Sequence, residues 1–381
     1  MTVATLLLAS AFVAFPDLSA REVSIQALIA LPELGARDQA LLRRIAHAIP
    51  YGSTDYGRKD ILAVTSGQPV RCVVMPDHLR IIISVQPANL NAGLGLAQSL
   101  LSRAALRAEH LQLLGEKRNY WNYALEPWKH QDSVPKAGEI GLLYQRVFRP
   151  ERTTLAVGGP VVPAQAQAEW ERRLRSWKMP PEPKGYFDIS ERDPLTVNPA
   201  GITTVDIAWQ APTRGPLLAD TVLALIALGS GKGSSLFRVI RNTYFLSYRQ
   251  EAVLWPTLGG FDARLVIAVD VAGNPPLDAI ANVLAGDVAK WTEAERLRAL
   301  GMAEAILLRG NAFGPFAFSS DEPLGSSLED RTFMAGYWKM KTGSDWDADR
   351  LLGEMRDVQL GELRAVAYAI VRGKATVLKG K

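Results

Sequence analysis

The chain has 381 residues, of which 48% are hydrophobic, so it can bury a large core and is long enough for two domains. Its 43 basic and 39 acidic side chains leave a net charge of +4, and the basic residues are dispersed. No stripe of lysine and arginine interleaved with aromatics is present, so the charge gives no indication of nucleic-acid binding. The single cysteine, Cys72, excludes an internal disulfide and a thiolate zinc site, and we expect it to be a buried core thiol.

The first twenty residues are predicted to be a candidate signal peptide. Val3–Phe15 is almost wholly apolar, but it is shorter than the ~20 residues that a membrane span requires. It resembles the hydrophobic region of a signal peptide, with Ala20 as a cleavage point, although no lysine or arginine precedes it. The alternative is that this segment is a buried first strand. We therefore expect export to the periplasm or the extracellular space, with a cytoplasmic location as the alternative, and no stable membrane insertion.

The first half of the chain alternates between strand-like and helix-like patterns. Apolar residues repeat with a period of 2 in some segments and of 3.6 in others. The predicted strands are 23–29, 70–75, 79–85 and 153–159, and the predicted helices are 38–48, 91–107 and 164–177. The helix at 91–107 is predicted to continue into a more polar helical stretch that ends near Trp121.

The strongest break in the chain is the proline-rich segment Pro180–Gly185, which is typical of an inter-domain linker. After it, the pattern predicts strands at 203–209, 251–255, 264–271 and 375–378, and helices at 217–228, 277–291, 294–308 and 362–371. The two halves have similar internal order. We therefore predict an α+β fold of two domains, 21–180 and 199–381, joined by a linker at 181–198, each with a mainly antiparallel sheet covered by helices.

The segment Gly229–Gly233 is rich in glycine and contains Lys232. A phosphate-binding P-loop needs a serine or threonine directly after the lysine and a different glycine spacing, on a loop that runs from a strand into a helix. Here Gly233 follows the lysine, and the preceding residues are predicted to be helical. The segment therefore does not indicate nucleotide binding.

The same segment resembles the C-terminal-half signature of pitrilysin-type (M16) metallopeptidases. A Gly/Ser-rich turn is followed by Leu-Phe, then an arginine, and a tyrosine seven residues after it; the matching residues are Gly229, Gly231, Gly233, Ser234, Leu236, Phe237, Arg241 and Tyr248. Phe245 stands where the family usually has glycine. The resemblance implies two homologous M16-type domains, and it implies that Arg241 and Tyr248 bind the substrate backbone and the oxyanion of the scissile carbonyl. Two strong hydrogen-bond donors suit that chemistry.

M16 enzymes carry His-x-x-Glu-His on an early helix, and this motif is degenerate here. The residues after His47 resemble those that follow the family's second histidine, so Arg43 replaces the first histidine and Ala46 replaces the glutamate. Arginine keeps its proton and alanine cannot act as a base, so we expect no zinc and no cofactor in this chain. Glu109 or Glu116 would match the family's third ligand, and His78, His110 and His130 form no metal-spaced pair.

The resemblance therefore implies a non-catalytic subunit. We predict a heterodimer in which a partner with an intact His-x-x-Glu-His motif holds the zinc, while Arg241 and Tyr248 act in trans on an extended peptide. The sequence leaves a homodimer open. The alternative is an M16-like scaffold or peptide-binding protein without a peptidase partner, and a third option is an enzyme that works through other residues.

Overall fold

The computed structural model divides into two compact units, which are described separately below. The residues whose structure is described are 11–75, 77–111, 137–178, 180–182, 197–198, 203–210, 219–247, 249–257, 260–269, 276–308, 316–319 and 327–380. Unit 1 contains those between 11 and 182 together with 328–346. Unit 2 contains those between 197 and 327 together with 347–380.

Unit 1 is built on a five-stranded sheet with the strand order β1-β5-β2-β4-β3. The pairs β5–β2, β2–β4 and β4–β3 are antiparallel, whereas the edge strand β1 runs parallel to β5. The strands are β1 (Ala11–Pro16), β2 (Val23–Ala30), β3 (Arg71–Val74), β4 (His78–Val85) and β5 (Thr153–Gly159). Part of the candidate signal peptide thus forms an edge strand of this sheet.

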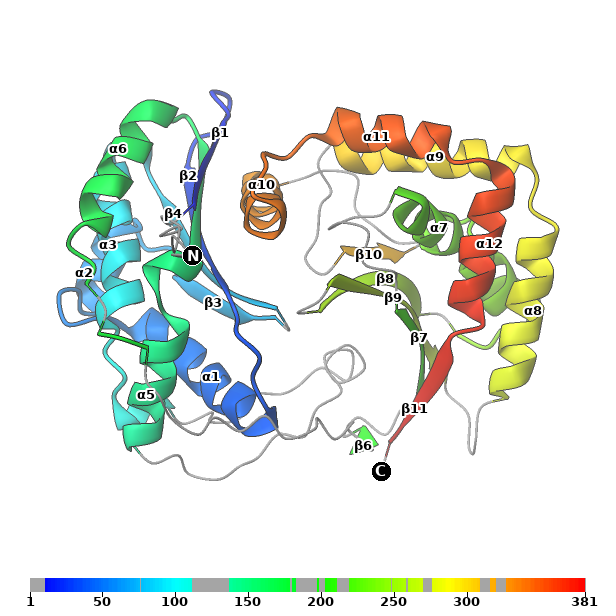
Figure 1. The fold of residues 1–381 in the computed structure, drawn as a ribbon, viewed down its shortest axis with the longest axis horizontal. Coiled ribbons are helices and arrows are strands. Elements are labelled where there is room, and N and C mark those ends of the chain that lie inside the picture. The colour runs from blue at the N-terminus through cyan, green and yellow to red at the C-terminus, as the bar shows by residue number, and fades with distance from the viewer. Residues whose placement is uncertain are drawn as a thin grey trace, which may run out of the picture. The chain divides into compact units, whose positions relative to one another are not determined.

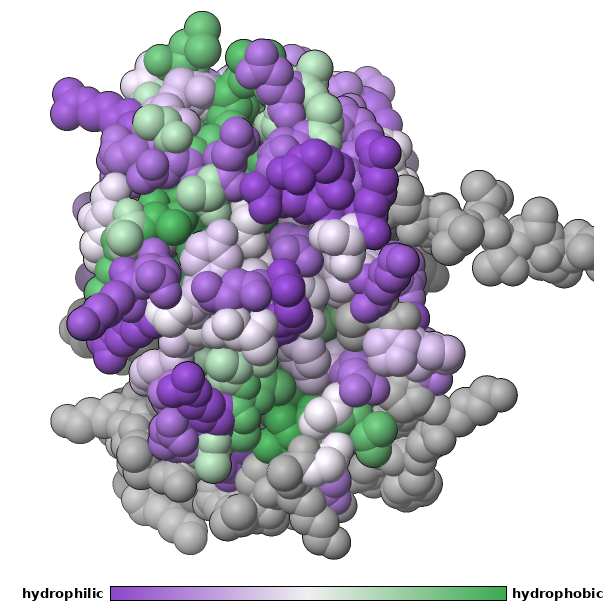
Figure 2. Space-filling view, turned by 90° about the vertical axis from the view of Figure 1, so that its left-hand side faces the viewer, coloured by the Kyte–Doolittle hydropathy of each residue, from purple (hydrophilic) through white to green (hydrophobic). Residues whose placement is uncertain are grey.

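Helices cover one face of this sheet (Figure 1). They are α1 (Ala36–Ala48), α2 (Arg58–Val64), α3 (Leu90–Arg103), α5 (Ala137–Val147) and α6 (Pro163–Leu174), with short helical turns η1 (Ile49–Tyr51), η2 (Pro87–Asn89), η3 (Ala108–Leu111) and η4 (Pro150–Arg152). Apolar side chains of β2 and β4, such as Ile25 and Ile81, pack with Leu42, Leu96 and Trp170 of the helices in one core. Figure 2 shows the outer side of these helices, where hydrophilic residues cover most of the upper part and apolar residues gather in the lower part.

The other face of the sheet is covered by α10 (Leu328–Thr342), which comes from the second half of the sequence (Figure 1). Glycine lets the helix approach closely, since a Cβ on Gly336 would lie 2.7 Å from Cβ of Ala156 and 2.8 Å from Cδ1 of Leu28. Polar contacts fix the start of the helix: the Gln26 amide donates to the Glu329 carbonyl at 2.6 Å, and the carboxylate of Glu329 pairs with Arg71. Unit 1 is therefore a sheet between two layers of helix.

Unit 2 is built on a six-stranded sheet with the order β10-β8-β9-β7-β11-β6. The described pairs are antiparallel except β11–β6. The strands are β6 (Val197–Asn198), β7 (Thr203–Gln210), β8 (Arg249–Thr257), β9 (Gly260–Val269), β10 (Phe316–Ser319) and β11 (Lys374–Gly380). The helices are α7 (Ala219–Gly229), η5 (Leu236–Thr243), α8 (Leu277–Ala289), α9 (Glu293–Leu308), α11 (Ala348–Asp357) and α12 (Leu360–Val371).

The α+β class and the helical cover are confirmed, and both sheets are mixed because β1 and β6 have parallel neighbours. The predicted strands and helices are present, with ends that differ by a few residues, and the stretch predicted to end near Trp121 lies outside the described residues after Leu111. The predicted division at 180 and 199 places all later residues in the second domain, whereas α10 belongs to unit 1. The duplication of the two halves stays a prediction. In the described part of the chain, none of the helices has the length and apolar character needed to cross a membrane.

Candidate functional site

Helix α1 carries the three residues of the degenerate metal motif. Ala46 is 4% exposed and lies in the core of unit 1, so its methyl group occupies packed apolar space. Arg43 is half-buried, and the neighbouring Arg44 donates from Nη1 to the carbonyl oxygen of Leu111 at 3.2 Å. This helix therefore attaches to η3 through a polar contact.

His47 contacts the same turn. Its Nδ1 lies 2.9 Å from the carbonyl oxygen of His110. Because a carbonyl oxygen only accepts, Nδ1 is the nitrogen that carries the proton in this contact. The ring of Tyr51 stacks on His110 with centroids 4.3 Å apart and lies 5.6 Å from the ring of His47. His47 is thus held in a small aromatic cluster between α1 and η3.

These residues do not fit a zinc ion. Zinc needs three or four nitrogen, sulfur or carboxylate ligands that converge on one point. No group of three or more such side chains is placed to hold a metal within the described residues. Glu109 is exposed on η3, and Glu116 lies outside the described residues, as does His130. Cys72 is partly exposed at the margin of the unit 1 core, where burial of its thiol raises its pKa.

In unit 2 the glycine-rich turn follows directly on α7, which ends at Gly229. The Ser230 amide continues the helical pattern by donating to the Ile226 carbonyl at 2.9 Å, and Gly231 then has a φ of +73°. Left-handed backbone of this kind favours glycine because it lacks a Cβ. A Cβ on Gly233 would lie 2.9 Å from Cδ of Arg298, so this glycine leaves room for the arginine side chain. The run before the turn is helical, as predicted.

The turn leads into η5, an eight-residue π-helix that carries Arg241. Ser234 is fully buried, and its hydroxyl oxygen accepts from the Phe237 amide at 3.3 Å, which caps the start of the helix. The guanidinium of Arg241 lies 5.0 Å from the ring centroid of Phe237, one turn earlier. π-Helices are rare and occur often at functional sites. Tyr248 lies outside the described residues, so its position relative to Arg241 stays a prediction.

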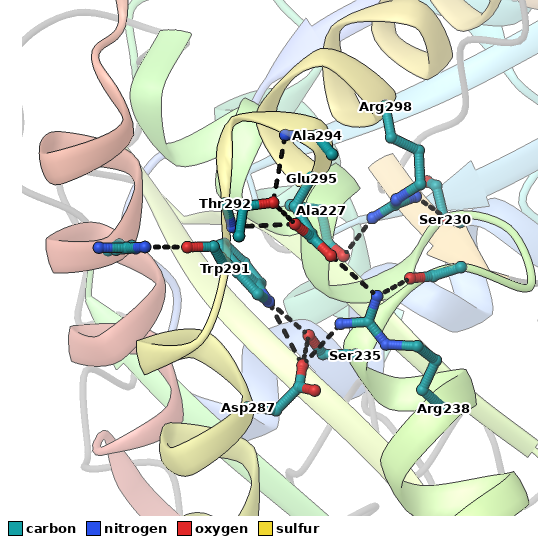
Figure 3. Close-up of polar contacts among 12 residues, drawn as sticks. Ala227, Ser230, Ser235, Arg238, Asp287, Trp291, Thr292, Ala294, Glu295 and Arg298 are labelled. Carbon is teal, nitrogen blue, oxygen red and sulfur yellow. Dashed lines mark hydrogen bonds and ion pairs between the residues drawn. The ribbon is translucent and has the colours of Figure 1, made fainter.

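A partly buried polar network fixes the turn and the start of η5 (Figure 3). At its centre Oδ2 of Asp287, on α8, accepts from the Ser235 hydroxyl at 2.5 Å and from Nη2 of Arg238 at 2.9 Å. The indole nitrogen of Trp291 donates to the same oxygen at 3.3 Å and to the hydroxyl oxygen of Ser235 at 3.1 Å. Nη1 of Arg238 reaches back to the carbonyl of Gly233 at 2.8 Å. One carboxylate thereby joins α8 to the end of the turn and the start of η5.

Helix α9 holds the turn from its other side (Figure 3). Arg298 donates from its two Nη atoms to the carbonyls of Ser230 and Ala227, at 2.9 and 2.8 Å, which satisfies the carbonyls at the end of α7. Burial lowers the pKa of Arg298. Glu295 accepts from the Thr292 hydroxyl, and this bond lowers the pKa of its carboxyl, while its second oxygen lies 3.6 Å from Arg238. The turn is therefore fixed by charged groups from two helices.

Sequence analysis did not identify these supporting residues. Arg238 belongs to the motif segment, but Asp287 and Arg298 lie about 50 to 70 residues later on α8 and α9, and Trp291 lies between these two helices. An acid or an arginine on such a helix gives no sequence signal of a buried partner. Only the packing of α8 and α9 against α7 and η5 reveals the network.

A second buried polar cluster lies in unit 1, where α10 meets the β3–β4 turn, and it too was absent from the sequence analysis. Oδ1 of Asp77 lies 2.7 Å from Nδ1 of His78, and Oδ2 accepts from the Tyr337 hydroxyl at 2.9 Å and from Lys341 at 2.5 Å. Burial opposes ionisation of Asp77, but His78 and Lys341 outweigh it and lower its pKa to about 2. Burial and the Asp77 charge raise the pKa of Tyr337 well above its ordinary value. The cluster fastens α10 to the sheet.

The comparison with family models decides the family. Residues 140–252 match the family described as peptidase M16 inactive domain. Over these residues the chain is of the M16 inactive-domain type. The matched residues include the glycine-rich turn and η5 but not α1 with its degenerate motif. The predicted resemblance is confirmed at the level of the family and the inactive-domain type.

Several solved structures share the fold over nearly the whole chain. A protease from Helicobacter pylori has a TM-score of 0.69 at 14% identity, covering 97% of this chain and 96% of that one. A peptidase M16 inactive domain from Pseudomonas fluorescens gives 0.69 at 13%, covering 97% and 95%. A predicted insulinase family protease from Yersinia pestis gives 0.62 at 12%, covering 95% and 88%. At such identities the likeness concerns the fold alone, and no curated protein matches the chain significantly.

Proposed function

We propose that this chain is the non-catalytic subunit of an M16-type zinc peptidase heterodimer, in which a partner chain carries the zinc. The observation that carries the proposal is an asymmetry between two segments. Ala46 and His47 on α1 are committed to core packing and to a bond with a backbone carbonyl. The turn before Arg241, by contrast, is held by a network of partly buried charged groups centred on Asp287.

The network gives Arg241 the rigidity that its proposed role requires. A donor stabilises a developing oxyanion best when it is fixed before the reaction, because little reorganisation is then needed in the transition state. Ser235 and Arg238 tie the first turn of η5 to Asp287, and the Arg241 guanidinium rests on the ring of Phe237. We propose that this guanidinium and the hydroxyl of Tyr248 donate in trans to the peptide backbone and to the carbonyl oxygen at the scissile bond.

We further propose that the extended peptide adds to a sheet edge by β-augmentation. In unit 1 the edge strand β3 pairs on one side with β4, and it packs near α1, the helix that carries the degenerate motif. Its second backbone edge therefore suits pairing with another extended segment.

The test is a peptidase assay of the complex with an M16 chain that has an intact His-x-x-Glu-His motif, ideally one encoded beside this chain. Arg241→Ala is expected to lower kcat by about 100-fold, as loss of one oxyanion donor does in other hydrolases. The matched control is Arg372→Ala, which removes an exposed arginine at the end of α12 in the same unit. Its rate should equal that of the unaltered complex.

The alternative role, a scaffold or peptide-binding protein without a peptidase partner, gives the opposite result. Under that role no complex with a zinc-bearing chain forms, or Arg241→Ala leaves the rate of the complex unchanged. Turnover by the purified chain alone that a chelator abolishes would contradict both roles. These three outcomes are separate, so the assay decides among them.

A further inference from the structure

Phe245, two residues after the end of η5, is in a backbone conformation that its side chain disfavours. The Tyr244 amide donates to the Val239 carbonyl at 3.1 Å and the Leu246 amide to the Ile240 carbonyl at 2.9 Å, and between them Phe245 has a φ of 52°. A helix that ends through a left-handed residue usually has glycine there, because a Cβ is strained in that region. The bulky side chain of Phe245 is therefore a conformational cost at this position.

Burial does not offset this cost. The Phe245 side chain is 75% exposed, and that of the adjacent Tyr244 is 49% exposed. An exposed ring gains little from the hydrophobic effect in the free chain. For folding alone, glycine would satisfy the same hydrogen bonds without strain. An unfavourable backbone conformation that packing does not explain points to a role outside folding.

The two aromatic residues are adjacent to the proposed substrate contacts in the chain. Phe245 follows Arg241 by four residues, so their Cα atoms lie at most about 14 Å apart. That distance corresponds to about four residues of an extended peptide. Phe245 also precedes Tyr248, the second proposed donor. A peptide whose backbone is held by Arg241 is thus within reach of the Phe245 ring with one of its nearby side chains.

We infer that Phe245, assisted by Tyr244, is a specificity-determining residue that selects extended peptides with a bulky apolar side chain within about four residues of the carbonyl held by Arg241. This inference rests on the proposed function and adds the substrate class to it. Covering an aliphatic or aromatic side chain with an aromatic surface removes apolar area from water on both partners. Partial burial of one such side chain should lower the Kd about tenfold relative to a peptide that lacks it.

The experiment measures the binding of two fluorescein-labelled ten-residue peptides to the full chain by fluorescence anisotropy. Both consist of serine, threonine and glycine, and one carries a central leucine where the other carries serine. The unaltered chain should bind the leucine peptide about tenfold more tightly. Phe245→Gly and Phe245→Ala should both reduce that preference to less than about twofold. Tyr368→Ala, which removes an aromatic residue of 48% exposure on α12, should retain it.

Thermal unfolding separates the specificity role from a folding role. Phe245→Gly should raise the unfolding midpoint because it relieves the left-handed strain, whereas Phe245→Ala retains a Cβ and should not raise it. If Phe245 serves binding, Phe245→Gly should both raise the unfolding midpoint and lose the preference for the leucine peptide. A fall in the midpoint of Phe245→Gly would show that the ring serves folding, and it would overturn the inference.

Arg241→Ala distinguishes failure of the inference from failure of the proposed function. It should weaken binding of both peptides by a similar factor. If Arg241→Ala weakens both but Phe245→Gly retains the tenfold preference, the inference fails while the proposed function stands. If Arg241→Ala affects neither peptide, or the unaltered chain binds neither at millimolar concentration, the proposed function and the inference fall together.

Discussion

Replacing Asp77 with asparagine should detach α10 from the sheet of unit 1 in a pH-dependent way. The change keeps the size of the side chain but removes the negative charge that Lys341 contacts at 2.5 Å. The side chains of Asp77 and Lys341 are 2% and 16% exposed, so water replaces little of the lost interaction. Removing one partner of a buried pair costs about 3–5 kcal/mol in other proteins, and we expect the lower end here because Lys341 keeps some access to water.

The pKa of Asp77 gives a second measure of the same interaction. It falls from 3.8 to about 2, and each unit corresponds to about 1.4 kcal/mol, so ionisation of Asp77 stabilises the folded state by about 2 kcal/mol. Because the folded-state pKa is the lower one, this stabilisation is present above pH 3.8 and disappears as the pH falls toward 2. The stability difference between the unaltered chain and Asp77→Asn should therefore be about 2–3 kcal/mol at pH 7 and less than about 1 kcal/mol near pH 2.

Urea unfolding at pH 7, 4 and 2.5, followed by tryptophan fluorescence, measures this difference, since Trp338 lies on α10 with Trp346 4.9 Å away. Hydrogen exchange of α10 at pH 7 shows whether the loss is local to this helix. The control is Asp345→Asn, which breaks an ion pair with Lys339 at a side chain that is 77% exposed and should have little effect. A loss that is equal at pH 7 and pH 2.5, or below about 1 kcal/mol at pH 7, would refute the reasoning.

Two further predictions concern the layers of unit 1. Gly336→Ala should destabilise the chain by about 1–3 kcal/mol because the new methyl group has no room against the sheet. Gly141→Ala, in open space on α5, should instead stabilise it by about 0.5–1 kcal/mol. Urea unfolding compares the two variants, and equal effects would contradict the close approach of α10. Deleting residues 2–20 removes β1 and the 2.6 Å ion pair of Asp17 with Arg331, and should cost at least about 2 kcal/mol in the same assay. A truncated chain of unaltered stability would instead fit a cleaved leader.

The sequence was sufficient for the elements whose pattern is local. β2 alternates between two buried faces and α1 has an apolar stripe, so each was predicted within about two residues of its observed ends. The segment around Arg241 was recognised for the same reason, because its residues form a motif contiguous in the chain. The degenerate motif was assigned in the same way, from the identities at Arg43, Ala46 and His47, and it stays a prediction.

Other elements gave no local signal. Residues 332–338 of α10 are buried without interruption, so this helix shows no stripe of alternating apolar and polar faces and was not predicted. β1 is a short apolar strand, and its pattern is equally compatible with a signal peptide. In both cases the neighbours that bury the segment, Leu28 and Ala156 for α10 and β5 for β1, are distant in sequence.

The sequence by itself therefore determined the class of fold, the family and the residues of both motifs, because each depends on a short run of neighbouring positions. Only the tertiary structure decided which side chains support them. The structure shows that Asp287 bonds to the residues after the glycine-rich turn and that Asp77 bonds to α10. It also shows that Phe245 is exposed and has a left-handed backbone conformation. Burial, charge pairing and backbone strain arise from contacts between distant segments, and the order of residues along the chain does not specify those contacts locally.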